Sequence, residues 1–149
     1  ARQASGAVRG GMDMTIEYTQ QRKAFKQPIC GLQNTQFKMA EVVTQLEVHT
    51  AFVDRCTALL GKGRLSPELA SMAKYAATDM QNKMLDECLQ LFGGYGYIWE
   101  YPIARFWADA RVSKIYAGTN EIMKLMIARA IFSGFFREMK QIMRARKGA

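Results

Sequence analysis

The chain is poor in three chemically distinctive residues: its 149 residues include three prolines, three cysteines and one histidine. Because proline removes a backbone donor and clashes with the preceding turn, so few prolines leave room for long helices. An odd number of cysteines without Cys-x-x-Cys spacing favours reduced, mostly buried thiols and argues against a disulfide framework. The histidine, His49, lies among apolar residues at helical spacing and cannot form a metal site alone. We therefore expect helices and no bound metal.

Long apolar runs are also missing, so we expect no membrane span. The chain begins Ala1-Arg2-Gln3, without a start methionine or the apolar core of a signal peptide. No capping residue precedes the helical pattern that includes Ala4, which indicates a first helix truncated at its N-terminus. We interpret the chain as a piece of a longer protein.

Acidic residues are outnumbered 13 to 21 by basic ones, which gives a formal net charge of +8. Such an excess permits binding to nucleic acid or to a membrane surface. Part of it lies near the end of the chain, so we interpret residues 136–149 as a basic, solvated C-terminal tail and expect no nucleic-acid partner. The rest could face anionic ligands such as pyrophosphate or CoA. The charged residues near the end are Arg137, Lys140, Arg144, Arg146 and Lys147, against Glu138.

Apolar residues that recur in steps of three and four predict four long helices and a short one. Ser66-Pro67-Glu68 is a strong start signal, since it combines a cap, a first-turn proline and a carboxylate near the positive end of the helix. No segment alternates with the period of a strand. The sequence thus predicts an all-α, up-and-down four-helix bundle over residues 1–135. The expected helices run from before Ala1 to about Lys23, then over 34–61, 67–92, 102–112 and 120–131. The expected core stripe of the third is Leu69, Met72, Ala76, Met80, Leu85, Cys88 and Leu91.

Three helix ends carry residue types that suit a ligand. The segment 90–94 ends a helix on Gly93 and Gly94, which allow a positive φ and leave bare backbone open to close approach. Arg22 could hold a diphosphate with forked hydrogen bonds. The segment 119–121 begins a helix with a threonine cap and an acidic first turn. Taken alone, each feature is also explained by capping or by a surface arginine.

The stretch from Gln90 to Arg129, with its GGYGY and YAGTNEIMK segments, resembles the C-terminal signature of the acyl-CoA dehydrogenases, closest to the long-chain type. The resemblance continues upstream through Gln21–Phe25 and Leu32-Gln33. It implies the C-terminal helical-bundle domain of an FAD-dependent oxidoreductase of fatty acid β-oxidation. The whole enzyme would remove the α-proton of an acyl-CoA, pass the β-hydrogen as hydride to the flavin and release a trans-2-enoyl-CoA. The isolated chain, without the other domains, is expected to be inactive.

The resemblance assigns roles to individual residues. Tyr116 and Gly118 would line the acyl-CoA pocket. Two positions depart from the family pattern: Lys26 replaces the glycine usual after the phenylalanine, and Ala24 stands where some members carry a phosphate-contacting threonine. The residues implied as FAD contacts are Arg22, Phe25, Leu32, Gln33, Gln90, Gly93, Gly94, Thr119, Asn120 and Glu121.

Ala117 is the decisive departure. Many family members place the catalytic glutamate between the tyrosine and the glycine that are Tyr116 and Gly118 here, because α-proton abstraction needs a carboxylate beside the substrate. A methyl group cannot act as that base, although the Ala117 N–H could still donate to the thioester carbonyl. Two explanations stay open. The base lies upstream of Ala1, as in long-chain and isovaleryl-type members, or the protein is a non-catalytic helical scaffold or partner subunit.

The resemblance also implies partners and a compartment. The substrate would be an acyl-CoA and the electron acceptor an electron-transferring flavoprotein. Family members form dimers or tetramers with FAD at the seam between subunits, so we expect a homo-oligomer. The location would be the cytoplasm of a bacterium or the mitochondrial matrix of a eukaryote.

Overall fold

The computed structural model describes residues 1–139. Helices dominate, so the predicted all-α fold is confirmed. Residues 133–139 are helical as well. The elements, in chain order, are α1 (Arg2–Gln21), β1 (Lys23–Ala24), β2 (Gln27–Pro28), the 3-10 helix η1 (Ile29–Gly31), α2 (Gln33–Gly61), α3 (Pro67–Phe92), the 3-10 helix η2 (Gly93–Tyr97), α4 (Pro102–Val112) and α5 (Asn120–Ile131).

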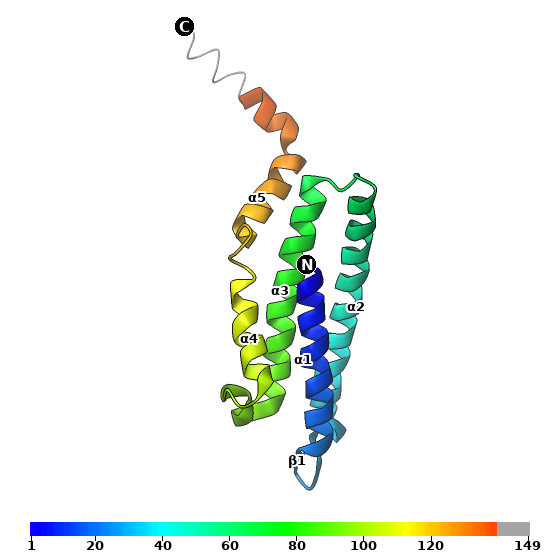
Figure 1. Cartoon of the computed structure of the whole chain (residues 1–149), viewed down its shortest axis with the longest axis vertical. Helices are drawn as coiled ribbons and strands as arrows, with labels where there is room; N and C mark the ends of the chain where they lie inside the picture. The colour runs from blue at the N-terminus through cyan, green and yellow to red at the C-terminus, as the bar shows by residue number, and fades with distance from the viewer. Residues whose placement is uncertain (140–149) are drawn as a thin grey trace.

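The helices form an up-and-down bundle around α3 (Figure 1). Helices α1, α2 and α3 lie side by side with alternating direction, and α3 contacts every other long helix. The fourth edge is built from α4 and α5, which follow one another along α3 and are separated by the loop at residues 113–119. This interruption places a loop part-way along the bundle.

The start of α3 confirms the predicted capping signal. The Ser66 side chain accepts a hydrogen bond from the Leu69 N–H at 3.3 Å, Pro67 occupies the first turn and Glu68 lies near the positive end of the helix. The turn before it closes through Gly63, whose φ of 64° suits glycine. These local signals fix the reversal between α2 and α3.

The core lies between α1, α2 and α3 and extends to α4. Its largest fully buried side chains include Leu46, Met84, Leu85 and Ile103. The predicted stripe on α3 is only partly correct, since a helix surrounded by four others buries more than one stripe. Leu69, Met72, Ala76 and Leu91 are half-buried, whereas the buried residues of α3 are Ser71, Ala73, Ala77, Thr78, Met80, Gln81, Met84, Leu85, Cys88 and Phe92.

Helices α1 and α3 approach closely at Gly11. A Cβ atom built on Gly11 would lie 2.4 Å from Leu85 Cδ2, so the missing side chain is what allows the contact. Small residues on the first helix therefore serve packing at this point.

Two further sequence predictions concern a membrane span and the C-terminal tail. Within residues 1–139, no helix is both long and apolar enough to cross a membrane. The predicted tail at 136–149 lies mostly outside the described residues, and the boundary at residue 135 falls inside the helical segment 133–139. That boundary stays a prediction.

Candidate functional site

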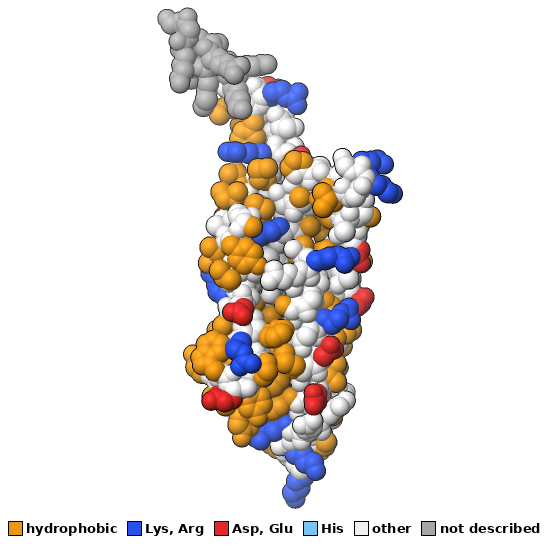
Figure 2. Space-filling view, viewed as in Figure 1, with side chains coloured by type: hydrophobic (Ala, Val, Ile, Leu, Met, Phe, Trp, Pro, Cys, Tyr) orange, Lys and Arg blue, Asp and Glu red, His pale blue; other side chains and the backbone are white. Residues whose placement is uncertain are grey.

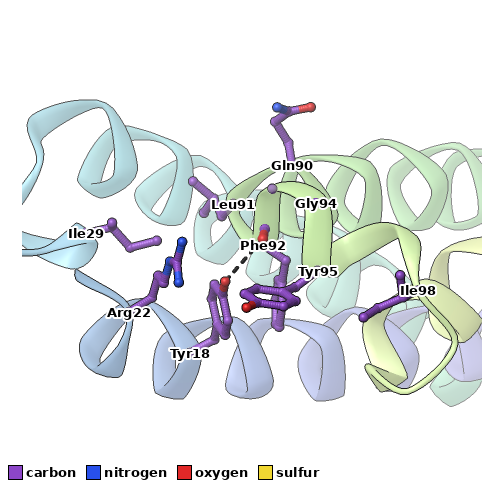
Figure 3. Close-up of a pocket in the computed structure, with 10 residues that line it drawn as sticks. Tyr18, Arg22, Ile29, Gln90, Leu91, Phe92, Gly94, Tyr95 and Ile98 are labelled. Atoms are coloured by element: carbon purple, nitrogen blue, oxygen red, sulfur yellow. Dashed lines mark hydrogen bonds between the residues drawn. The ribbon is translucent and has the colours of Figure 1, made fainter. Parts of the chain in front are cut away.

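A cleft of about 520 Å³ opens where α1 ends and α3 gives way to η2 (Figure 3). It brings together Arg22 from the end of α1 with Gln90, Gly93 and Gly94 from the end of α3. These four residues were singled out from the sequence, and the fold gathers them although about 70 residues separate them along the chain. The lining residues are Tyr18, Arg22, Ile29, Gln90, Leu91, Phe92, Gly93, Gly94, Tyr95 and Ile98.

Both backbone groups of Arg22, its N–H and its carbonyl, are hydrogen-bonded. Its N–H donates to the Tyr18 carbonyl at 2.8 Å, and its own carbonyl accepts from the Ile29 N–H at 2.8 Å. The guanidinium carbon lies 5.5 Å from the centroid of the Tyr95 ring, a cation–π arrangement. Arg22 forms no ion pair within residues 1–139, so its charge is not neutralised by a neighbouring carboxylate there.

The double glycine leaves bare backbone on the cleft. Gly93 ends α3 with φ 58° and ψ −137°, and its N–H donates to the Gln90 carbonyl. A Cβ atom built on Gly93 or Gly94 meets no heavy atom within 4 Å, so both backbones face open space. The Gln90 amide points away from Arg22 and Tyr95 in Figure 3 and lies exposed at the rim. A ligand could therefore approach the peptide groups directly.

A cluster of four aromatic rings lies at the cleft, and three of them, Tyr18, Phe92 and Tyr95, line it. Tyr18 stacks on Phe92 with ring centroids 4.1 Å apart, and its hydroxyl donates to the Phe92 carbonyl at 3.2 Å. Tyr101 joins edge-on to both rings, while Tyr95 stacks on Tyr101 at 5.1 Å. Burial raises the pKa of the Tyr18 phenol, so it stays a neutral donor in ordinary buffers. The cluster holds the ends of α1 and α3 together.

The connector after α1 is a small hairpin in which β1 pairs antiparallel with β2. The turn between them places Phe25 at φ 51° and Lys26 at φ 66°, the left-handed region that type I′ hairpins require. The Phe25 side chain is 86% exposed. Phe25, Leu32 and Gln33 do not line the cleft within this chain: Leu32 and Gln33 stand at the start of α2, where the Leu32 N–H donates to the Ile29 carbonyl at 3.1 Å.

Replacing Lys26 by glycine is expected to stabilise the protein. A non-glycine residue in the left-handed region is strained by about 1–2 kcal/mol, and the greater freedom of glycine in the unfolded chain offsets about half of that. We expect a net gain of about 0.5–1 kcal/mol in the free energy of unfolding, measured by urea denaturation. The matched control is Lys23→Gly, at a position without positive φ, which should destabilise instead.

The second group of predicted residues surrounds the loop between α4 and α5. Ala117 has φ 53° and Gly118 has φ 89°, while Tyr116 is 46% exposed. The Tyr116 N–H donates to the Val112 carbonyl at 3.1 Å and the Asn120 N–H to the Lys114 carbonyl at 3.0 Å. Within residues 1–139, the N–H groups of Ala117 and Gly118 have no protein acceptor. The loop thus presents two free donors.

Asn120 is buried, and its side chain ties α5 to α3. Asn120 as a whole is only 2% exposed. Its Oδ1 accepts from Lys74 Nζ at 2.7 Å and from the Thr78 hydroxyl at 3.1 Å, and its Nδ2 donates to Thr78 Oγ1 and Asp79 Oδ1, each at 3.0 Å. Asp79 also pairs with Lys114 at 2.7 Å. This network fixes both ends of the loop at 113–119.

The start of α5 confirms the predicted cap. Thr119 Oγ1 accepts from the Ile122 N–H at 3.4 Å, and Glu121 lies in the first turn. Hydrogen bonds from its own backbone N–H and from Thr119 hold the pKa of the Glu121 carboxyl below the usual 4.5. This contribution to stability is present above pH 4.5 and is lost as the pH falls through the lowered value.

Replacing Glu121 by glutamine should therefore weaken the dependence of the free energy of unfolding on pH in the acidic range. We expect the variant to be less stable than the wild type above pH 4.5 and to converge with it at lower pH. Thermal unfolding across this pH range measures the effect. Glu100→Gln, which changes an exposed carboxylate without an ion pair in the described part of the chain, should shift the curve little. A constant difference at every pH would contradict the account.

The two groups of residues lie apart in one chain. Arg22 and the double glycine occupy the end of the bundle that carries the hairpin, whereas α5 begins further along the fourth edge (Figure 1). Thr119, Asn120 and Glu121 do not line the cleft. The single chain therefore assembles one part of the predicted cofactor site and leaves the other on a separate surface.

Comparison with known proteins decides the family. The family model described as "Acyl-CoA dehydrogenase, C-terminal domain" matches residues 1–132. The chain belongs to the acyl-CoA dehydrogenase family. The mitochondrial long-chain specific acyl-CoA dehydrogenase of Mus musculus is 53% identical over 119 residues, which are 80% of this chain and 28% of that protein.

Solved structures of acyl-CoA dehydrogenases share the fold. An acyl-CoA dehydrogenase from Geobacillus kaustophilus superposes with a TM-score of 0.84 and 41% identity, over 86% of this chain and 34% of that one. A glutaryl-CoA dehydrogenase from Mycobacterium smegmatis, solved in complex with FADH2, superposes with a TM-score of 0.83 and 29% identity, over 87% and 34%. The chain thus spans about a third of the length of these relatives.

Sequence reasoning missed several residues around both groups. Tyr18 lies four residues before Arg22 on the same face of α1, a spacing that could have pointed to it. Tyr95 follows the double glycine directly. Lys74, Thr78 and Asp79 gave no signal, because a polar residue on a helix is usually solvated and their partner lies more than 40 residues away.

Proposed function

We propose that this chain is the FAD-binding and oligomerising C-terminal domain of an acyl-CoA dehydrogenase that oxidises an acyl-CoA to a trans-2-enoyl-CoA. The observation that carries the proposal is the cleft, where an unneutralised guanidinium, Arg22, faces bare backbone at Gly93 and Gly94. That combination suits a diphosphate, since the guanidinium supplies forked hydrogen bonds and the glycines allow close approach. Membership of the family and the FADH2-bound relative support the same assignment.

The residues present fit a dinucleotide. The cleft at Arg22, Gln90, Gly93 and Gly94 would hold the diphosphate and ADP portion. When bound, FAD supplies the redox chemistry by accepting the substrate's β-hydrogen as hydride. The remaining proposed contacts, on surfaces outside the cleft, would face cofactor held mainly by another subunit. They are Phe25, Leu32, Gln33, Thr119 and Glu121. The predicted contact Asn120 is instead buried against α3, so its side chain would hold the start of α5 in place.

The loop at 113–119 would serve the substrate. Tyr116 and Gly118 would line the acyl-CoA pocket, and the free N–H of Ala117 would donate to the thioester carbonyl as negative charge develops there. Ala117 and Gly118 both have positive φ, so the backbone leaves the helical hydrogen-bond pattern at this loop. The proton itself would be taken by a glutamate N-terminal to Ala1.

The exposed apolar surface supports assembly. Large apolar side chains gather over α4 and α5 in Figure 2, and exposed apolar patches mark interaction surfaces. We expect a homodimer or homotetramer, with electron-transferring flavoprotein as the electron acceptor. The location would be the cytoplasm of a bacterium or the mitochondrial matrix of a eukaryote. The apolar residues of this patch include Trp107, Val112, Ile115, Tyr116, Ile122, Leu125 and Met126.

The experiment that tests the proposal adds acyl-CoA thioesters to the complete gene product and follows bleaching of the flavin absorbance. We expect a yellow protein that is bleached by a saturated acyl-CoA. A colourless protein that keeps the helical bundle would instead support a second candidate, a non-catalytic scaffold or partner subunit, which the methyl group of Ala117 favours. Reading the codons before Ala1 separates the two, since a glutamate one or two helical turns upstream is expected for the enzyme alone.

A further inference from the structure

The chain continues past the family match into a segment that leaves the bundle. The match ends at residue 132, and residues 133–139 form a helical segment beyond it. Figure 1 shows this segment extending past the end of α5, away from α1 and α2. The Phe136 N–H donates to the Phe132 carbonyl at 3.1 Å, which starts the helical turn. Because the segment lies beyond the family match, the family does not imply a role for it.

The segment carries a continuous apolar face. Phe132, Phe135, Phe136 and Met139 stand at positions i, i+3, i+4 and i+7, so a helix places them on one side. Their exposed fractions are 56%, 58%, 41% and 37%. The Phe135 and Phe136 rings contact each other edge-on with centroids 5.6 Å apart. Nothing else in residues 1–139 covers this face.

The charges around the face select the kind of partner. From residue 129 to the end, the sequence has six basic residues and one acidic residue, Glu138. A second copy of the segment would bring two strongly basic stretches together, which electrostatic repulsion opposes. Nucleic acid would match the charge but would leave the phenylalanines exposed. An anionic bilayer satisfies both features, because its surface attracts the cations and its interior accepts the aromatic rings.

We propose that residues 129–139, which include Arg129 and Arg137, form a docking surface for an anionic lipid bilayer. The apolar face of Phe132, Phe135, Phe136 and Met139 enters the boundary between headgroups and acyl chains, and Arg129 and Arg137 contact the lipid phosphates. This is attachment in the plane of the membrane. It does not depend on whether the chain binds FAD.

Vesicle co-sedimentation of the full 149-residue chain tests the proposal. We expect binding to vesicles of phosphatidylglycerol and phosphatidylcholine in equal parts, weak binding to pure phosphatidylcholine, and a decrease with added salt. Equal binding to both vesicles, or no binding to either, would overturn the proposal. Binding to duplex DNA at least as tight as to the anionic vesicles would overturn it in favour of a nucleic-acid surface.

Two sets of variants separate the apolar from the electrostatic contribution. Phe135→Ser/Phe136→Ser should lower the partition onto anionic vesicles by at least about tenfold, since two buried aromatic rings are lost. The matched control, Phe37→Ser, removes an equally exposed ring from α2 and should change little. Partitioning that is unchanged in the double variant would overturn the proposal.

The variants that test the electrostatic contribution are also a double variant and a matched control. Arg129→Gln/Arg137→Gln should weaken binding about 25-fold, at roughly fivefold for each cation near the surface. Arg55→Gln/Arg111→Gln removes the same charge from exposed sites on α2 and α4 that form no ion pair in the described part of the chain. Equal losses for both pairs would show that net charge alone drives binding and would overturn the assigned surface.

Discussion

Replacing Asn120 by alanine is expected to lower the free energy of unfolding by about 2–3 kcal/mol, because a buried hydrogen-bonding partner is removed from a polar network. For a domain of this size that corresponds to a fall of about 5–10 °C in the melting temperature. The loss falls mainly on Lys74, whose ammonium donates to Asn120 Oδ1 at 2.7 Å. Burial already lowers the pKa of Lys74, so its charge is costly without an acceptor. Thr78 and Asp79 keep other partners.

A double-mutant cycle checks this explanation. If the cost arises from the stranded ammonium, Lys74→Met/Asn120→Ala should be more stable than the sum of the two single changes predicts. Strict additivity would show that the contact between the two side chains is not the cause. Asn34→Ala changes an exposed asparagine at the start of α2 and should alter the melting temperature little. Calorimetry at neutral pH measures the four proteins of the cycle and the control.

Replacing Arg22 by glutamine should weaken the binding of ADP by about 10–100-fold, because charge-assisted hydrogen bonds to phosphate contribute about 1.5–3 kcal/mol. The chain has ADP-sized space beside Arg22, and the guanidinium has no competing carboxylate within residues 1–139. Isothermal titration calorimetry on the 149-residue chain measures the change. We expect weak binding by the wild type, since the relatives are about three times longer.

The control is Arg55→Gln, which removes one exposed cation from α2 without touching the cleft. A similar loss in both variants would mean that ADP responds only to the net charge of +8. Tyr95→Leu adds an independent test. It keeps the charge of Arg22 but removes the ring over which the guanidinium lies, so an intermediate loss is expected.

Helix starts and ends that depend on neighbouring residues were predicted correctly from the sequence. The cap at Ser66, the proline at the start of α3 and the cap at Thr119 each act within one helical turn, and the structure has all three. Gly93 at the end of α3 is a similar case, since its φ of 58° is a local requirement. The all-α fold followed from periodicity alone.

Features that depend on contacts far apart in sequence were harder to predict. The burial around α3 departs from a single stripe because four helices surround it. The hairpin after α1 was not predicted, because strands of two residues are too short to show a strand period. Asn120 shows the same limit: beside a threonine cap it resembles an ordinary first-turn residue, and only the fold reveals that its amide binds α3.

The candidate site was predictable in its parts and not in its assembly. Arg22 and the double glycine were singled out by residue type, and the structure brings them into one cleft. Tyr18 and Tyr95, which complete its wall, are common core residues by type alone. How the loop at 113–119 relates to the cleft depends on the neighbouring subunit that we propose.

The most direct test of the central claim is a nuclear magnetic resonance titration of the 149-residue chain with ADP. The account predicts that backbone amide shifts move first and most strongly at residues 18–31 and 90–98, the two segments that meet at the cleft. Shifts confined to the basic residues from 137 onward, or no shifts at these two segments at any attainable ADP concentration, would contradict it.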